Sequence, residues 1–165
     1  MLPYRPNVGV ALFNRAGRVF AGFGQSAGPE IVTPGHEWQM PQGGVDADED
    51  IVAAARRELR EETGVTRAAL LDVTPDWASY DFPPYDGPAH RLCAWRGQRQ
   101  KWVAFRFGGE DSDIDISAPN GDEPPEFSQW RWAPLADLPA LVVPYKRPVY
   151  ERVARRFARF AAIRT

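Results

Sequence analysis

The sequence predicts an α/β/α sandwich built by one domain spanning residues 1–165. Strand-like apolar runs enclose a single strongly patterned helix, and an amphipathic helix closes the chain; this order of elements suits helices on both faces of a sheet. The length of 165 residues and the 44% hydrophobic content allow a substantial core. We find no internal repeat and no linker that would divide the chain.

The first predicted strands are residues 7–13 and 18–23, joined by a turn at 14–17 that ends in glycine. Residues 24–37 are rich in Gly, Pro and Ser and predict a loop. Residues 38–44 then predict a short strand that runs into a glycine turn, where the backbone can approach a ligand closely.

The region after the central helix predicts further strands at residues 68–73, 99–107 and 127–132. Residues 77–88 are crowded with aromatic and proline residues and predict a loop. Its rings either cover a core edge or form a platform for base stacking, and for Tyr80 we favour ligand contact. Residues 108–125 predict an acidic surface loop with a short strand at 113–116.

A short helical turn over residues 134–138 precedes a C-terminal helix that Pro148 opens. This helix has an apolar face and a basic face, the basic residues being Arg152, Arg155, Arg156 and Arg159. We interpret the basic face as solvated, with RNA or membrane contact as the alternative.

Charge and cysteine content limit the possible functions. The net charge of −2 argues against bulk nonspecific binding of nucleic acid, although not against binding one phosphorylated end. Cys93 is the only cysteine, so no intrachain disulfide can form, and we expect it in the core or a strand. The sequence has neither the apolar run of a signal peptide nor a membrane-length stretch. We therefore expect a cytoplasmic protein without membrane partners.

The central helix is capped by Asp48 or Asp50 and ends at Gly64, which suits a left-handed turn. Its apolar residues share one arc of the helix: Ile51, Ala54, Ala55 and Leu59. Its glutamates continue that arc toward the body of the protein: Glu58, Glu61 and Glu62. The arginines take the opposite side: Arg56, Arg57 and Arg60.

Inward-facing glutamates distinguish this helix from an ordinary solvated charged face. Three buried carboxylates repel one another and are costly without a cation. Arg57 can pair with Glu61, but one arginine cannot neutralise three acids. A hard divalent cation with oxygen ligands can, and Mg²⁺ prefers a few carboxylates together with substrate phosphates.

The segment 43–65 resembles the Nudix box. Gly43, Glu49 six positions later, and the run 57–65 fill every specified position of that signature. The resemblance implies an α/β/α sandwich with a mixed β-sheet, and Mg²⁺- or Mn²⁺-dependent hydrolysis of a nucleoside diphosphate linked to another moiety. It also implies that Glu49 pairs structurally with Arg57.

The resemblance extends over nearly the full length to one branch of the family, which contains the bacterial RNA 5′-pyrophosphohydrolases and the asymmetric diadenosine tetraphosphate hydrolases. The matching segments are residues 4–9, 38–44, 77–83, 98–102, 125–127 and 143–150. Together they are specific for the branch and not for one substrate.

By this resemblance, the metal ligands are Gly43, through its carbonyl, and Glu58, Glu61, Glu62 and Glu126. Without the resemblance, Glu126 would be taken as an ordinary loop carboxylate. The residues that match substrate-binding positions are Arg5 and Lys101 near the phosphate chain, and Val143 and Lys146 beside the first base. The ordinary alternatives are an edge-strand residue for Val143 and a surface position for Lys146.

One departure concerns phosphate binding. Relatives usually carry an arginine just after the second strand, where this chain has Gly22-Phe23-Gly24, and the following loop, residues 25–37, is longer than is typical. The cation is therefore absent or supplied elsewhere, which leaves the preferred polyphosphate length open.

The expected reaction is metal-assisted hydrolysis of a phosphoanhydride, with Glu58 or Glu62 taking the proton from the attacking water. The substrate is an RNA 5′-triphosphate end, losing pyrophosphate, or diadenosine tetraphosphate, giving ATP and AMP. The alternatives are a housecleaning nucleoside triphosphate pyrophosphatase and a non-catalytic nucleotide-sensing module. The sequence leaves the oligomeric state and the base preference open.

Overall fold

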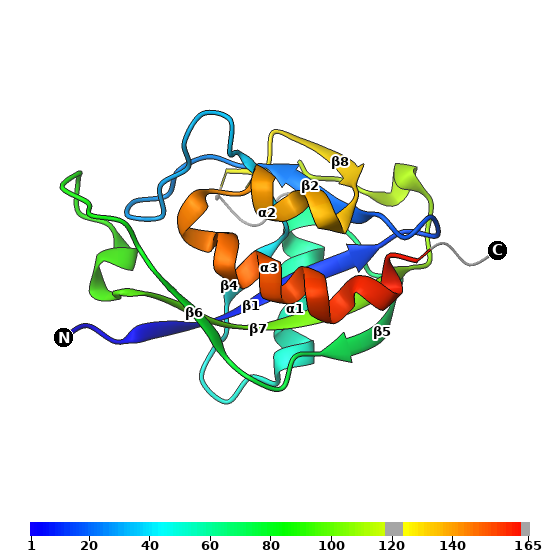
Figure 1. Ribbon diagram of the computed structural model, residues 1–165, viewed down its shortest axis with the longest axis horizontal. Coiled ribbons are helices and arrows are strands. Elements are labelled where there is room, and N and C mark those ends of the chain that lie inside the picture. Colours follow the sequence, from blue (N-terminus) through cyan, green and yellow to red (C-terminus); the bar gives the residue numbers. More distant parts are fainter. Residues whose placement is uncertain (118–123, 163–165) are drawn as a thin grey trace.

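A computed structural model describes residues 1–117 and 124–162 of the chain. One eight-stranded sheet runs through it (Figure 1). Its strands are β1 (Tyr4–Phe13), β2 (Val19–Phe23), β3 (Trp38–Gln39), β4 (Gln42–Gly44), β5 (Ala68–Val73), β6 (Ala78–Asp81), β7 (Gly97–Phe107) and β8 (Gln129–Ala133).

The sheet is mixed, as the family resemblance implied. Strands β1 and β7 are parallel over ten residues, from Tyr4 opposite Gly97 to Phe13 opposite Arg106. All other strand pairs are antiparallel. At one end of this central pair, β4 flanks β1 and β6 flanks β7; at the other end, β2 and β5 take those places.

Helices cover both faces of the sheet, which confirms the predicted sandwich (Figure 1). The helix α1 (Ile51–Thr63) packs on one face through Ala54, Ala55 and Leu59. The helix α3 (Arg147–Phe157), with the short α2 (Leu138–Leu141), packs on the other through Val149, Val153 and Phe157. Single 3₁₀ turns cover Arg91–Ala94, Asp111–Asp113, Leu135–Asp137, Pro144–Lys146 and Ala158–Phe160.

The ends of α1 follow the sequence signals. Asp50, and not Asp48, caps the start, since its carboxylate accepts a hydrogen bond from the Ala53 backbone N–H at 3.0 Å. Gly64 adopts the left-handed conformation with φ of 74° and donates its N–H to the Arg60 carbonyl. These caps fix the rotation of the helix, and with it the direction of its glutamates.

Two local expectations were wrong. Residues 78–81 form the strand β6 within the segment predicted as a loop, because Ala78 and Tyr80 are buried and alternate with exposed residues along β7. No strand forms at residues 113–116; the first of them closes a 3₁₀ turn at Asp111–Asp113. The rest of that acidic loop, residues 118–123, lies outside the described residues.

The outer surface of α3 is exposed at its arginines. Arg156 of α3 and Arg159 of the 3₁₀ turn that follows it form ion pairs with Asp72 of β5. Cys93 is exposed in the 3₁₀ turn at Arg91–Ala94, so the expectation of a core or strand position was wrong. No helix in the described parts of the chain has the length and apolar character needed to cross a membrane.

Candidate active site

An open pocket lies between β4 and the side of α1 that carries the glutamates. It brings together residues that are far apart in the sequence, and the predicted members of its wall are Arg5, Gly43, Glu58, Glu61, Glu62 and Glu126. The segment around Glu126 reaches this pocket because it precedes β8, which pairs with β2, and because the adjacent Phe127 packs in the same core cluster as the apolar face of α1.

The glutamates of α1 face the protein. Glu58 and Glu62 are four residues apart, so they share one side of the helix, and each is only 9% exposed. Glu61 is half-buried at the rim. The structure therefore has the inward orientation that the apolar arc of the helix predicts.

Glu62 is buried and only weakly compensated, by a hydrogen bond from the Gln42 backbone N–H. Its Oε2 has no hydrogen-bond partner among the described residues. Burial, followed by repulsion from Glu126 and Glu58, raises the pKa of Glu62 well above its ordinary value. A negative charge at Glu62 thus requires a nearby cation.

Glu58 is partly compensated. Burial is the main influence and raises the pKa of Glu58 to about 7, with a further contribution from Glu61; Arg57 opposes this rise. The Arg57 Nη1 donates to Glu58 Oε1 at 2.7 Å.

Arg57 holds the start of the helix against the glycine turn. Its guanidinium donates to both oxygens of Glu49 at 2.9 Å and to the Gly44 carbonyl at 2.8 Å. This pairing lowers the pKa of Glu49 to about 2 and raises that of Arg57. Helix geometry predicted Arg57 on the side opposite the acids, but its guanidinium contacts two of them, donating to Glu58 at 2.7 Å and to Glu61 at 3.4 Å.

Gly43 leaves room for the acids. A Cβ at this position would overlap the Glu58 carboxylate, which lies directly against the glycine backbone. The carboxylate is the flexible end of its side chain, so a larger residue would displace Glu58 without disrupting the strand.

Gly43→Ala is therefore expected to fold normally and to lose roughly 10- to 100-fold in activity, comparable with the loss of a group that orients metal ligands. The measurements are kcat/KM and thermal unfolding. Gly35→Ala serves as the control, because open space surrounds Gly35; its positive φ of 88° predicts a loss of stability only. Wild-type activity in Gly43→Ala would show that the position of Glu58 is unimportant.

The acid pocket fits a divalent cation. Its donors are carboxylate oxygens, the preferred ligands of hard cations, and one of them is the unpartnered, buried Oε2 of Glu62. Within residues 1–117 and 124–162, no three His, Cys, Asp or Glu side chains already converge in ligand geometry. The acids line a common cavity, and their side chains must rotate toward one another to bind a single cation.

Four residues predicted to contact substrate do not line the pocket. Tyr80 and Val143 are buried, with exposures of 5% and 2%. Lys146 is 1% exposed and forms an ion pair with Glu30, so it does not have the surface position that sequence reasoning offered as the ordinary alternative. Lys101 lies over the Trp77 ring, with Nζ 5.0 Å from the centroid, and alternates along β7 with the pocket residue Gln98.

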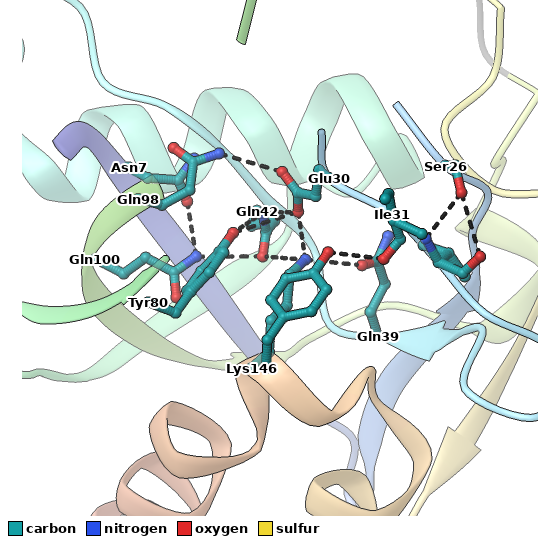
Figure 2. A network of polar contacts seen from close by, with 12 residues as sticks. Asn7, Ser26, Glu30, Ile31, Gln39, Gln42, Tyr80, Gln98, Gln100 and Lys146 are labelled. Atoms are coloured by element: carbon teal, nitrogen blue, oxygen red, sulfur yellow. Dashed lines mark hydrogen bonds and ion pairs between the residues drawn. The ribbon is translucent and has the colours of Figure 1, made fainter. Parts of the chain in front are cut away.

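The pocket also contains residues that sequence analysis did not identify: Asn7, Glu30, Gln42, Arg91 and Gln98. All except Arg91 belong to a polar network behind the pocket (Figure 2). Gln42 adjoins the box glycine and Gln98 begins a matching segment, so both were identifiable from their neighbours. Glu30 and Arg91 lie in irregular segments without a pattern, and only the fold brings them to the site.

The fold and this pocket together define a class of protein: α/β/α domains that hold a helix of inward-facing glutamates against a glycine turn. The sequence of residues 3–153 matches the protein-family model described as the NUDIX domain. The chain therefore belongs to the NUDIX family, whose hydrolases use divalent metal ions.

The relatives agree with this assignment. The chain is 52% identical over 160 residues to the RNA pyrophosphohydrolase of Acidiphilium cryptum, covering 97% of this chain and 93% of the relative. It is equally similar to the RNA pyrophosphohydrolase of Rhodopseudomonas palustris strain HaA2, with 97% and 95% covered. Among solved structures, the E. coli dihydroneopterin triphosphate pyrophosphohydrolase has the same fold, with a TM-score of 0.61 at 17% identity, covering 93% and 99% of the two chains.

Proposed function

We propose that this protein is a Mg²⁺-dependent RNA pyrophosphohydrolase that removes pyrophosphate from RNA 5′-triphosphate ends. The observation that carries the proposal is the buried carboxylate of Glu62, whose Oε2 has no hydrogen-bond partner among the described residues and which lies in one pocket with Glu58, Glu126 and the cation Arg5. The names of the half-identical relatives support the choice of substrate.

The proposed metal ligands are the Gly43 carbonyl and four of the five acids that line the pocket: Glu58, Glu61, Glu62 and Glu126. All are oxygen donors, which favours Mg²⁺, with Mn²⁺ as the substitute. When bound, the metal stabilises negative charge on the phosphate oxygens and activates the attacking water.

The protein's own residues supply the remaining chemistry. Glu58 or Glu62 accepts the proton that the attacking water releases. Arg57 is paired with Glu49 on one side and contacts Glu58 on the other, so it holds Glu58 at the pocket rim. Arg5 reaches Gly44 and the cavity, where it can neutralise a phosphate oxygen.

Arg91 is a second candidate for phosphate binding. It lines the pocket from the 3₁₀ turn and is exposed, and it is the other cation of the pocket wall besides Arg5. We propose that it supplies the positive charge that this chain lacks after β2.

Arg91→Ala is expected to raise KM for triphosphorylated RNA roughly 10- to 100-fold with little change in kcat, because one charge-assisted contact is worth about 1.5–3 kcal/mol. Steady-state kinetics measure both parameters. Arg155→Ala, an exposed arginine on α3, is the matched control. An unchanged KM in Arg91→Ala would mean that the phosphates are held without Arg91.

The substrate is tested by comparing rates of hydrolysis of a triphosphorylated RNA and of diadenosine tetraphosphate, with Mg²⁺ and then Mn²⁺. Both substrates present a nucleoside on a polyphosphate chain. The proposal expects faster release of pyrophosphate from the RNA. Faster production of ATP and AMP from diadenosine tetraphosphate would reverse the assignment, and hydrolysis of neither would refute it. We place this activity in the cytoplasm and in a single domain of residues 1–165.

A further inference from the structure

We infer that Glu30 is a positioning residue: it fixes the orientation of the pocket's amide side chains, so that the wall beside the acids recognises the nucleoside part of the substrate. The inference rests on the proposed function for the identity of that substrate. Glu30 lies in the long loop between β2 and β3, and it reaches the pocket from there.

Glu30 is the centre of the polar network (Figure 2). Its Oε1 accepts hydrogen bonds from Gln42 Nε2 at 2.8 Å and from the Tyr80 hydroxyl at 3.3 Å, and it pairs with the Lys146 ammonium. Its Oε2 accepts a hydrogen bond from Gln98 Nε2 at 3.2 Å. Each oxygen of the carboxylate therefore orients a neighbouring side chain.

The loop that carries Glu30 is itself held in place. The Ser26 hydroxyl accepts a hydrogen bond from the Val32 N–H at 2.8 Å, and the Tyr145 hydroxyl donates to the Ile31 carbonyl at 2.7 Å. These contacts lie on either side of Glu30, so its carboxylate is fixed relative to the turn at Pro144–Lys146.

An ionised carboxylate determines which end of a neighbouring amide side chain faces it, because the carboxylate only accepts hydrogen bonds. Lys146 holds Glu30 ionised by its adjacent charge. Gln98 must therefore turn its NH₂ group toward Glu30, which leaves its Oε1 facing away. That oxygen is buried and has no hydrogen-bond partner among the described residues, and Gln98 lines the pocket.

A second chain of contacts fixes the neighbouring amide. The Trp102 indole only donates, and its Nε1 donates to Gln100 Oε1 at 3.1 Å. The Gln100 Nε2 then donates to Asn7 Oδ1 at 2.9 Å. Asn7 Nδ2 is left buried without a partner among the described residues, and Asn7 also lines the pocket.

The two free groups form a complementary pair. Asn7 lies opposite Gln100 in the parallel β1–β7 register, so Gln98 is its near neighbour on the same face of the sheet. One group is a donor and the other an acceptor. They match a ligand group that both accepts and donates, namely the edge of a nucleobase or a ribose hydroxyl. An ionised phosphate has only hydrogen-bond acceptors, so it could not donate a hydrogen bond to the Gln98 oxygen.

The charge of the wall agrees with this choice. Glu30 neutralises Lys146, so the network presents amides and not a free cation to the pocket. Polyphosphate is therefore expected at the arginines and acids, and the uncharged nucleoside beside the amides.

The test uses the double variant Glu30→Gln/Lys146→Met in the full-length protein. It removes both buried charges together, since either single change leaves the other charge buried without its partner. Glu37→Gln is the control, because Glu37 lies in the same loop and its side chain accepts, among the described residues, only the Gly35 N–H hydrogen bond. Thermal unfolding confirms that each variant is folded.

The substrates are triphosphorylated dinucleotides with each of the four first bases, and one with a 2′-deoxyribose. In the double variant, KM is expected to rise about tenfold, the equivalent of one or two hydrogen bonds, with kcat within about threefold of wild type. If the amides contact the base edge, the double variant should discriminate less between the four first bases than wild type does. If they contact the ribose hydroxyl, wild type should have a higher KM for the 2′-deoxy substrate than for the ribose substrate, and this difference should disappear in the double variant. Unchanged KM and unchanged discrimination would overturn the inference.

Binding of inorganic tripolyphosphate without divalent metal, measured by calorimetry, separates positioning from general damage. Its affinity is expected to stay the same in the double variant, and a parallel loss of tripolyphosphate and dinucleotide affinity would overturn the inference. If wild type binds the dinucleotide but hydrolyses no RNA, the proposed function fails, and the comparison of these two affinities still decides the role of Glu30.

Discussion

Glu62→Gln is expected to lower turnover of triphosphorylated RNA by about 10²–10⁴-fold, the range for loss of a proton-accepting carboxylate at a metal site. The amide keeps the size of the side chain but removes its charge, so neither a divalent cation nor a proton is held as before. Steady-state kinetics with Mg²⁺ and with Mn²⁺ measure the effect.

The fold should survive this change. Glu62 is buried beside Glu58 and Glu126, and its Oε2 has no partner among the described residues. Replacing the carboxylate by a neutral amide relieves repulsion, so the free energy of unfolding without divalent metal should be unchanged or higher. The increase in melting temperature on adding Mn²⁺ should be smaller than in wild type. Glu151→Gln, on the exposed side of α3, is the control; near-normal turnover in Glu62→Gln would remove Glu62 from the mechanism.

Lys146→Met is expected to lower the free energy of unfolding by about 3–5 kcal/mol, the usual result of leaving one member of a buried ion pair without its partner. Lys146 is 1% exposed, and its ammonium contacts Glu30 from within the network. Urea unfolding near neutral pH measures the loss. The variant Glu30→Gln/Lys146→Met should recover most of it, and a single variant as stable as wild type would mean that the pair is not buried in solution.

The pH dependence of stability should change direction with this substitution. In wild type, burial raises the pKa of Glu30, but Lys146, with smaller contributions from Gln98 and Tyr80, outweighs it and lowers that pKa overall. The stabilising contribution of Glu30 is therefore present above its ordinary pKa of 4.5 and is lost as pH falls. In Lys146→Met, burial alone remains dominant and raises the pKa of Glu30. Stability should then fall as pH rises above about 4.5 through that raised pKa. Unfolding measured from pH 3 to pH 8 distinguishes the two slopes: the Glu30 contribution in wild type falls toward the acid end of this range, and in Lys146→Met it falls toward the neutral end.

Local sequence signals were sufficient to predict the ends and the orientation of the helix that carries the acids. Asp50 and Gly64 set its ends, and the spacing of Ala55 and Leu59 with the glutamates set its rotation. The orientation of Glu58 and Glu62 follows from this local pattern alone.

Residues that reach the pocket from distant segments could not be predicted by such patterns. Glu126 was identified only by family resemblance, since its own neighbourhood is an acidic loop. The Glu30–Lys146 pair joins positions 116 residues apart, and neither residue lies in a periodic segment. The strand at residues 78–81 was missed because its alternation covers four residues between a tryptophan and a proline-rich run.

The central parallel pair has a consequence for the order in which the chain acquires its structure. Tyr4 lies opposite Gly97 and Phe13 opposite Arg106, so β1 gains this neighbour only after about a hundred residues have been synthesised. Pairings between such distant positions form slowly because the intervening chain must first be closed into a loop. A nascent chain that ends before β7 would therefore expose the apolar edge of β1, and chaperone contact or aggregation during translation should be greatest in that interval.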